Sequence, residues 1–157
     1  MIRIRAHGHA LALAFGIVAL FAASAKGLQA TPPAWSLGAP IYEVNLQMFS
    51  KAGTFKELER QVPRLKEQSV GILWLMPITT RGVLKAFGSP YCVKDYKGLH
   101  APYGSAQDFR DLVTAAHKAD LRIILDWVPN HSSWDNSLTT EHPEFYKKTA
   151  DGKIAQA

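Results

Sequence analysis

VGILWL, residues 70–75, is a short and continuous apolar run with no polar face. Such a run is typical of a strand that is covered on both faces, as in a parallel sheet. A second run of the same kind, RIILDWV, occupies residues 122–128. Residues 41–46 (IYEVNL) alternate between apolar and polar side chains and predict an earlier strand. The chain therefore contains three predicted strands.

A helix is predicted between the first and second strands. Thr54 and Glu57 have the spacing of a capping box, which satisfies free N–H groups at a helix start. Pro63 is expected to kink or restart this helix, because proline has no N–H to donate. Four apolar side chains repeat along one helical face and predict its buried side: Phe55, Leu58, Val62 and Leu65.

A second helix is predicted between the second and third strands. Ser105 and Asp108 cap its start. Its apolar stripe consists of Phe109, Leu112, Val113 and Ala116. The order β-α-β-α-β, with buried-type strands, predicts an α/β fold with a parallel sheet.

Two segments follow the carboxyl ends of the predicted strands, where ligands of α/β sheets bind. Residues 76–104 show little periodicity, and a loop of this length inside a domain is usually functional. Asp126, Asn130 and His131 follow the third strand, and all three side chains can converge at its mouth. Asp126 and His131 can hydrogen-bond sugar hydroxyls, and an asparagine carbonyl is a plausible Ca²⁺ ligand. The same spacing also fits a strand-end cap with a satisfied histidine.

The segment DWVPNH, residues 126–131, resembles the D-x-V-x-N-H signature of glycoside hydrolase family 13, the α-amylase family. Further segments resemble family motifs and occur in the family's order. They are residues 41–43, 74–78, 88–96 (GSPYCVKDY), 103–109 and 116–118. Ser69 and Asp120 stand where helices of the family end in glycine, and His100 replaces a common asparagine.

The resemblance implies an incomplete TIM barrel: the N-terminal β-α-β-α-β portion of a (β/α)8 fold. It divides the chain into four parts. These are a signal peptide at 1–25, a lead-in at 26–36, the first three βα units at 37–131, and the start of a loop domain at 132–157.

Roles for four residues follow from the resemblance. The position of Tyr91 stacks its ring on the sugar beside the scissile bond. Asp126 lies beneath that sugar and supports the site, and His131 donates a hydrogen bond to it. Asn130 binds a structural Ca²⁺ in many members. Asp95 is expected to have a structural role in the loop.

The implied chemistry is retaining hydrolysis of α-glucosidic bonds in starch or maltooligosaccharides, with one carboxylate as nucleophile and another as acid/base. In the family these carboxylates follow the fourth and fifth strands, so no catalytic carboxylate is expected in residues 1–157. Asp126 is therefore not expected to act as the nucleophile. Alternatives are a transglycosylase, a non-catalytic glucan-binding protein, or a small α/β domain of unrelated function.

Composition and charge bound the remaining classes. Apolar residues make up 47% of the chain and charged residues 20%, which fits a globular protein. The net charge is +5, and the basic and acidic residues are interspersed along the chain. They do not form the basic stripe that is typical of a nucleic-acid-binding protein. Cys92 has no internal disulfide partner. Arg3 and Arg5, a short apolar run and Ala-Ser-Ala at 23–25 predict a signal peptide, hence a secreted or periplasmic protein without a membrane partner after cleavage. An N-terminal membrane anchor is the alternative.

Overall fold

The computed structural model describes residues 31–156 of the chain. It divides into two units, Met1–Leu37 and Gly38–Ala157. In the first, the described residues contain one 3-10 helix, η2 (Ala34–Ser36), which lies in the predicted lead-in. The predicted signal peptide lies outside the described residues. The elements below belong to the second unit.

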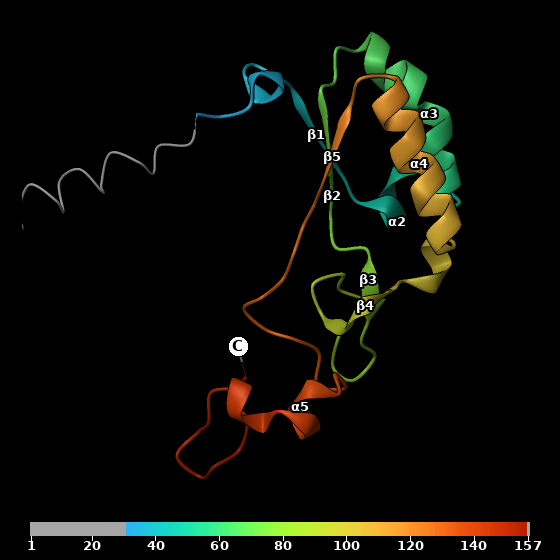
Figure 1. The fold of residues 1–157 in the computed structure, drawn as a ribbon. Helices are drawn as coiled ribbons and strands as arrows, with labels where there is room; N and C mark the ends of the chain where they lie inside the picture. Colours follow the sequence, from blue (N-terminus) through green and yellow to red (C-terminus); the bar gives the residue numbers. More distant parts are fainter. Residues whose placement is uncertain (1–30, 157) are drawn as a thin grey trace, which may run out of the picture. The chain divides into compact units, whose positions relative to one another are not determined.

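The second unit contains a parallel sheet of three strands in the order β1-β2-β5 (Figure 1). β1 is Ile41–Val44, β2 is Ile72–Leu75 and β5 is Arg122–Leu125. Their carboxyl ends are in register, because both Val44 and Leu125 pair with Leu75. The predicted parallel β-α-β-α-β order is confirmed, and the three strands do not close into a barrel.

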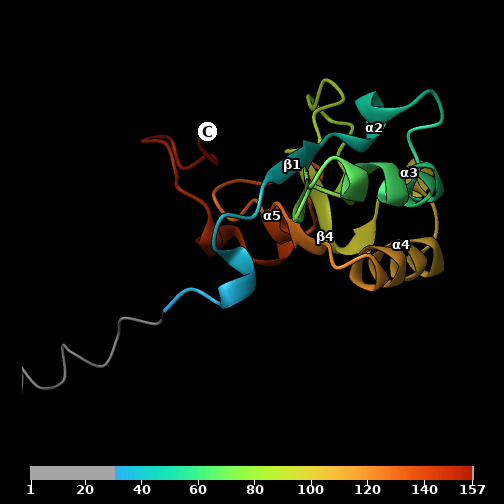
Figure 2. The same cartoon turned by 90° about the horizontal axis from the view of Figure 1, so that it is seen from above.

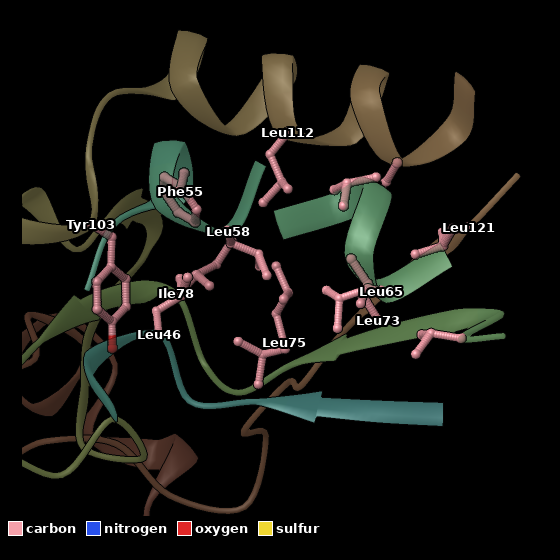
Figure 3. Packing of buried hydrophobic residues seen from close by; sticks show 14 residues of the cluster. Leu46, Phe55, Leu58, Leu65, Leu73, Leu75, Ile78, Tyr103, Leu112 and Leu121 are labelled. Atoms are coloured by element: carbon pink, nitrogen blue, oxygen red, sulfur yellow. The ribbon is translucent and has the colours of Figure 1, made fainter. Parts of the chain in front are cut away.

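Two helices cross over between the strands and cover one face of the sheet (Figures 1 and 2). α3 is Phe55–Glu67 and α4 is Ala106–Lys118. The predicted apolar face of α3 is buried along its whole length. It packs with Leu73, Leu75 and Leu112, each fully buried, in one apolar cluster between sheet and helices (Figure 3). This burial holds the strands in place.

The helix starts follow the predicted caps with one difference. Ser105 and Asp108 form a complete capping box at α4. At α3, Thr54 accepts a hydrogen bond from the Glu57 amide, but the Glu57 carboxylate pairs with Arg60 instead of returning to the cap. The predicted box at α3 is therefore half formed.

α3 continues through Pro63 as one helix, so the predicted restart is wrong. Pro63 is exposed, whereas Val62 and Leu65 on either side of it are buried. Packing of these neighbours offsets the roughly 3 kcal/mol that an interior proline costs.

Ser69 and Asp120 end the two helices in the left-handed conformation, with φ of 63° and 57°. The amide of the next residue bonds back into the helix in both cases: Val70 to the Leu65 carbonyl at 3.1 Å, and Leu121 to the Ala116 carbonyl at 2.9 Å. These are Schellman-type ends, for which glycine is the usual residue. The two replacements of glycine are thus accommodated by tight turns, at about 1 kcal/mol each.

Two predictions about segment boundaries are wrong. The first strand ends at Val44, because Asn45 caps the short helix α2 (Leu46–Phe49) by accepting from the Gln47 amide. Residues 76–104 are not wholly irregular: they contain the antiparallel strands β3 (Thr79–Arg81) and β4 (Val93–Leu99), and the 3-10 helix η3 (Ala101–Tyr103). The glycine and proline residues in this stretch interrupt the alternating pattern that would have predicted the hairpin.

The residues after β5 form short elements. The helix α5 is Leu138–Glu141, and the 3-10 helix η4 is Pro143–Phe145. An isolated bridge then pairs Lys148 with Ile154.

The sheet face opposite the two helices is open in the second unit at the two outer strands, whereas Ile72 on the central strand is buried. Ile41 is 56% exposed and Ile124 is 38% exposed. The expectation of strands covered on both faces holds for β2, whose apolar residues are mostly buried, but not for β5. Within residues 31–156, no helix has the length and apolar character needed to span a bilayer.

Candidate functional site

The loops after β2 and β5 meet beyond the carboxyl end of the sheet. The segment after β5 runs from the sheet to the β3–β4 hairpin (Figure 1). The main-chain amide of Asp126 donates to the Leu75 carbonyl at 2.8 Å, which extends the β2–β5 ladder by one rung. The Ser133 amide donates to the Val93 carbonyl, also at 2.8 Å. The intervening segment is therefore fixed to the sheet at one end and to β4 at the other.

Tyr91 and Asp126 are in direct contact at this junction. The Tyr91 hydroxyl donates to Asp126 Oδ2 at 2.8 Å. This bond raises the pKa of Tyr91 to about 12, with burial and the carboxylates of Asp126 and Glu43 adding to the shift. Tyr91 therefore remains a protonated donor at neutral pH. Asp126 keeps its second oxygen, Oδ1, for another donor.

Asn130 and His131 form a second pair. The Asn130 amide nitrogen lies 3.3 Å from His131 Nδ1. In the tautomer whose imidazole proton lies on Nε2, Nδ1 accepts from the Asn130 amide and Nε2 can donate to a ligand. Asn130 is exposed and His131 is half-buried, so both can reach a molecule in solvent.

The four predicted site residues therefore form two pairs. No hydrogen bond joins one pair directly to the other in the part of the chain that the structure describes. Tyr96 on β4 binds the main chain of the second pair's loop: its hydroxyl lies 2.9 Å from the carbonyl oxygens of both Val128 and His131.

A polar clamp, which consists of Ser133, Asp135 and Asn136, holds the end of this segment against the hairpin. Asn136 is 3% exposed, and its amide donates to the Val93 carbonyl at 3.1 Å. Asp135 accepts from the amide of Val83 at 3.2 Å and pairs with Lys94 at 3.4 Å. Its hydrogen bond from the Ser133 hydroxyl is the main cause that lowers its pKa to about 2.

Gly82 lets the clamp approach the hairpin. A Cβ at this position would overlap the hydroxyl of Ser133 and crowd the Asp135 carboxylate. Close approach of two chain segments, rather than a positive φ, is therefore what requires glycine here.

A family model described as "Alpha amylase, catalytic domain" matches residues 25–152. The chain belongs to the alpha-amylase family. The predicted resemblance to this family is thereby confirmed over most of the sequence.

Known members of the alpha-amylase family agree in sequence and in fold. An α-amylase structure from Lactobacillus plantarum has 38% sequence identity and a TM-score of 0.70, over 75% of this chain and 29% of that chain. Alpha-amylase 3 of Dictyoglomus thermophilum is 34% identical over 71% of this chain and 21% of its own length. Trehalose-6-phosphate hydrolase of Bacillus subtilis is 31% identical over 71% of this chain and 19% of its own length. The chain thus spans about a fifth of the curated relatives that it matches.

Calcium binding by this alpha-amylase-family chain remains a prediction. The amide nitrogen of Asn130 faces His131, which leaves Oδ1 free for a cation. Calcium takes six to eight oxygen ligands, and Asn130 would provide one. Among residues 31–156, no group of three or more His, Cys, Asp or Glu side chains is arranged to hold a metal.

Several residues at this junction escaped the sequence reasoning or were assigned differently. Tyr96 stands out in the sequence only as part of the motif at residues 88–96, and no motif includes Asp135. Asn136 and Ser133 sit in a polar stretch with no periodicity. The partners that join them to the other loop are more than 30 positions away in sequence, so no local pattern could identify these contacts. Asp95, expected to be structural, makes a local hydrogen bond with the Lys97 amide.

Proposed function

We propose that this chain forms the sugar-gripping part of an active site that acts on α-glucosidic bonds, as in starch or maltooligosaccharides. The observation that carries the proposal is the Tyr91–Asp126 hydrogen bond, which joins two polar loops beyond the carboxyl ends of parallel strands. Relatives named as α-amylase, α-glucosidase and trehalose-6-phosphate hydrolase support the substrate class.

Each of the site residues has a distinct task in this proposal. The aromatic face of Tyr91 packs on the apolar C–H face of a glucose ring. The hydrogen bond from its hydroxyl to Asp126, at 2.8 Å, holds the ring in the orientation for this contact. Asp126 accepts a sugar hydroxyl through Oδ1, and His131 donates through Nε2. Asn130 orients the imidazole and offers its carbonyl oxygen to a structural Ca²⁺.

Bond cleavage in the proposed reaction follows the retaining route, which uses two carboxyl groups about 5–5.5 Å apart. Asp126 is engaged by a tyrosine hydroxyl and serves binding rather than attack. Hydrogen bonds from the sugar-gripping residues strengthen as the ring approaches an oxocarbenium-like geometry. We expect residues 1–157 to bind glucan without cleaving it, with the nucleophile and acid/base supplied by later segments of the barrel.

Binding tests the sugar-gripping role. We expect maltotriose to bind the chain with a millimolar Kd in calorimetry, and cellotriose, its β-linked counterpart, to bind much more weakly. Asp126→Ala should weaken maltotriose binding roughly 10-fold or more, because it removes a charged hydrogen-bond partner. A matched change at the exposed Asp95 (Asp95→Ala) should have little effect. Absence of heat from maltotriose at tens of millimolar would contradict the proposal.

A graft tests catalysis. Residues 38–152 would replace the matched region of the Lactobacillus plantarum α-amylase, and starch hydrolysis would be measured. We expect an active graft in which Tyr91→Ala lowers kcat/KM by about 100-fold, because ring stacking positions the reacting sugar. A folded, glucan-binding but inactive graft would favour the non-catalytic alternative, and transfer products in place of hydrolysis would favour a transglycosylase.

Export is a separate part of the proposal. A basic start, an apolar run and Ala-Ser-Ala at 23–25 favour cleavage before Lys26 and a secreted or periplasmic product. Mass spectrometry of the exported protein should find Lys26 as the first residue. Retention of residues 1–25 in a membrane fraction would instead support the anchor alternative.

A further inference from the structure

The Tyr96 hydroxyl contacts two main-chain carbonyl oxygens in the loop after β5. Tyr96 lies on β4 directly after Asp95, which pairs with Thr80 of β3, and before a register irregularity that ends at Leu99. Its hydroxyl lies 2.9 Å from the Val128 carbonyl and 2.9 Å from the His131 carbonyl. Because a phenol has one proton, the two carbonyl oxygens share it, and both ends of the turn at 128–131 meet at one atom.

The turn has few other restraints. Among residues 31–156, no other hydrogen bond reaches the main chain between the Asp126 and Ser133 amides, apart from the two made by Tyr96. Pro129 in the middle has no N–H to donate. The exposed side chain of Asn130 contacts only its neighbour His131 by a hydrogen bond. Tyr96 is therefore the point that fixes this turn to the rigid hairpin.

We infer that Tyr96 is a positioning residue for His131: by binding the carbonyls of Val128 and His131, it sets where the imidazole stands relative to a bound sugar. This inference rests on the proposed function, because that function supplies the sugar to which His131 would donate a hydrogen bond. Tyr96 acts through the main chain and does not itself touch the sugar.

The surroundings of Tyr96 keep its hydroxyl in the donor state. Burial is the main cause that raises its pKa, and the nearby Tyr146 hydroxyl adds to the effect. The Tyr146 and Ser132 hydroxyl oxygens are hydrogen-bonded at 2.6 Å, so the two tyrosines contact neighbouring parts of the same segment. Tyr96 is the one of these two that reaches His131.

Tyr96→Phe tests the inference, because it removes one oxygen atom and leaves the ring in place. The matched control is Tyr42→Phe, which changes a tyrosine on β1 that is 36% exposed. The readout is the ¹H–¹³C NMR correlation signal of the His131 ring. Comparison with a His131→Gln spectrum assigns this signal among the chain's 6 histidines. Maltotriose affinity is measured on the same samples.

We expect the His131 signal to shift or broaden in Tyr96→Phe and to stay unchanged in Tyr42→Phe. Maltotriose should bind Tyr96→Phe about 5-fold more weakly, because one hydrogen bond holds the turn in its binding position. An unchanged His131 signal in folded Tyr96→Phe would overturn the inference. Absence of maltotriose binding by the unaltered chain would sink the proposed function, while the His131 signal would still decide the role of Tyr96.

A second measurement covers the case in which Tyr96→Phe does not fold. Backbone ¹⁵N relaxation of the unaltered chain should give order parameters for Val128, Asn130 and His131 as high as those of β4, near 0.85. Values below about 0.6, as in flexible loops, would overturn the inference, because the turn would then move independently of the hairpin.

Discussion

The helix-covered side of the sheet and the loop layer beyond its carboxyl end are held together by different forces. Between sheet and helices, contact is apolar: Leu73, Leu75 and Leu112 are fully buried. In the loop layer, polar bonds connect the segments, through Tyr91 to Asp126 and through Asn136 to the Val93 carbonyl. The first region resembles any α/β core, and the second carries the residues that we propose for sugar binding.

This difference has a physical consequence. Apolar burial is non-directional and scales with area, so it tolerates changes of pH and salt. Hydrogen bonds to buried groups depend on geometry and on protonation state, and a lost partner leaves an unsatisfied group. The loop layer is thus placed accurately but is the more sensitive of the two regions.

The largest effect is expected in the apolar region. Leu73→Ala should lower the free energy of unfolding by about 3 kcal/mol, because Leu73 is 0% exposed and its loss leaves a cavity. Urea denaturation followed by far-UV circular dichroism measures this. A change below about 1 kcal/mol would mean that the cluster in Figure 3 is loosely packed.

A smaller effect is expected in the loop layer. Asn136→Ala should cost about 2 kcal/mol, because it leaves the Val93 carbonyl with one donor fewer and removes the side-chain oxygen that accepts from the Leu138 amide. Hydrogen exchange should report the loss in the clamp more strongly than in α3 or α4. Equal loss in both regions would show that they unfold as one unit. Ser137→Ala, at the exposed neighbour, is the control.

Acid should loosen the loop layer before the core. The pKa of Asp135 is lowered to about 2 from 3.8, so its stabilisation is present above pH 4 and is lost as the pH falls from about 4 to 2. The expected size is about 1 kcal/mol, since the carboxylate is partly exposed. Fluorescence of Trp134 should follow this loss. Asp135→Asn should abolish the acid step; its persistence would assign the step to another carboxylate.

The smallest effect on stability is expected on the open sheet face. Ile124→Lys should change the free energy of unfolding by less than about 1 kcal/mol, because Ile124 is already 38% exposed. It should reduce self-association, since exposed apolar strands promote aggregation. Sedimentation velocity compares it with the unaltered chain. A large loss of stability would mean that this face is covered in solution.

The sequence alone determined the parallel β-α-β-α-β order and the buried residues of α3, because apolar periodicity reports local secondary structure and its covered face. Its motifs also predict Tyr91, Asp126, Asn130 and His131 as site residues, and this remains a prediction. It did not find the β3–β4 hairpin, where glycine and proline mask the strand pattern.

Only the tertiary structure decided which of these residues meet. Tyr91 and Asp126 are 35 positions apart, as are Tyr96 and His131, and no local pattern encodes a hydrogen bond across that separation. The clamp at Ser133 and Asn136 likewise exists only because two loops share one end of the sheet. Local physics sets the elements of this chain, whereas the packing of its strands in register brings the polar residues together.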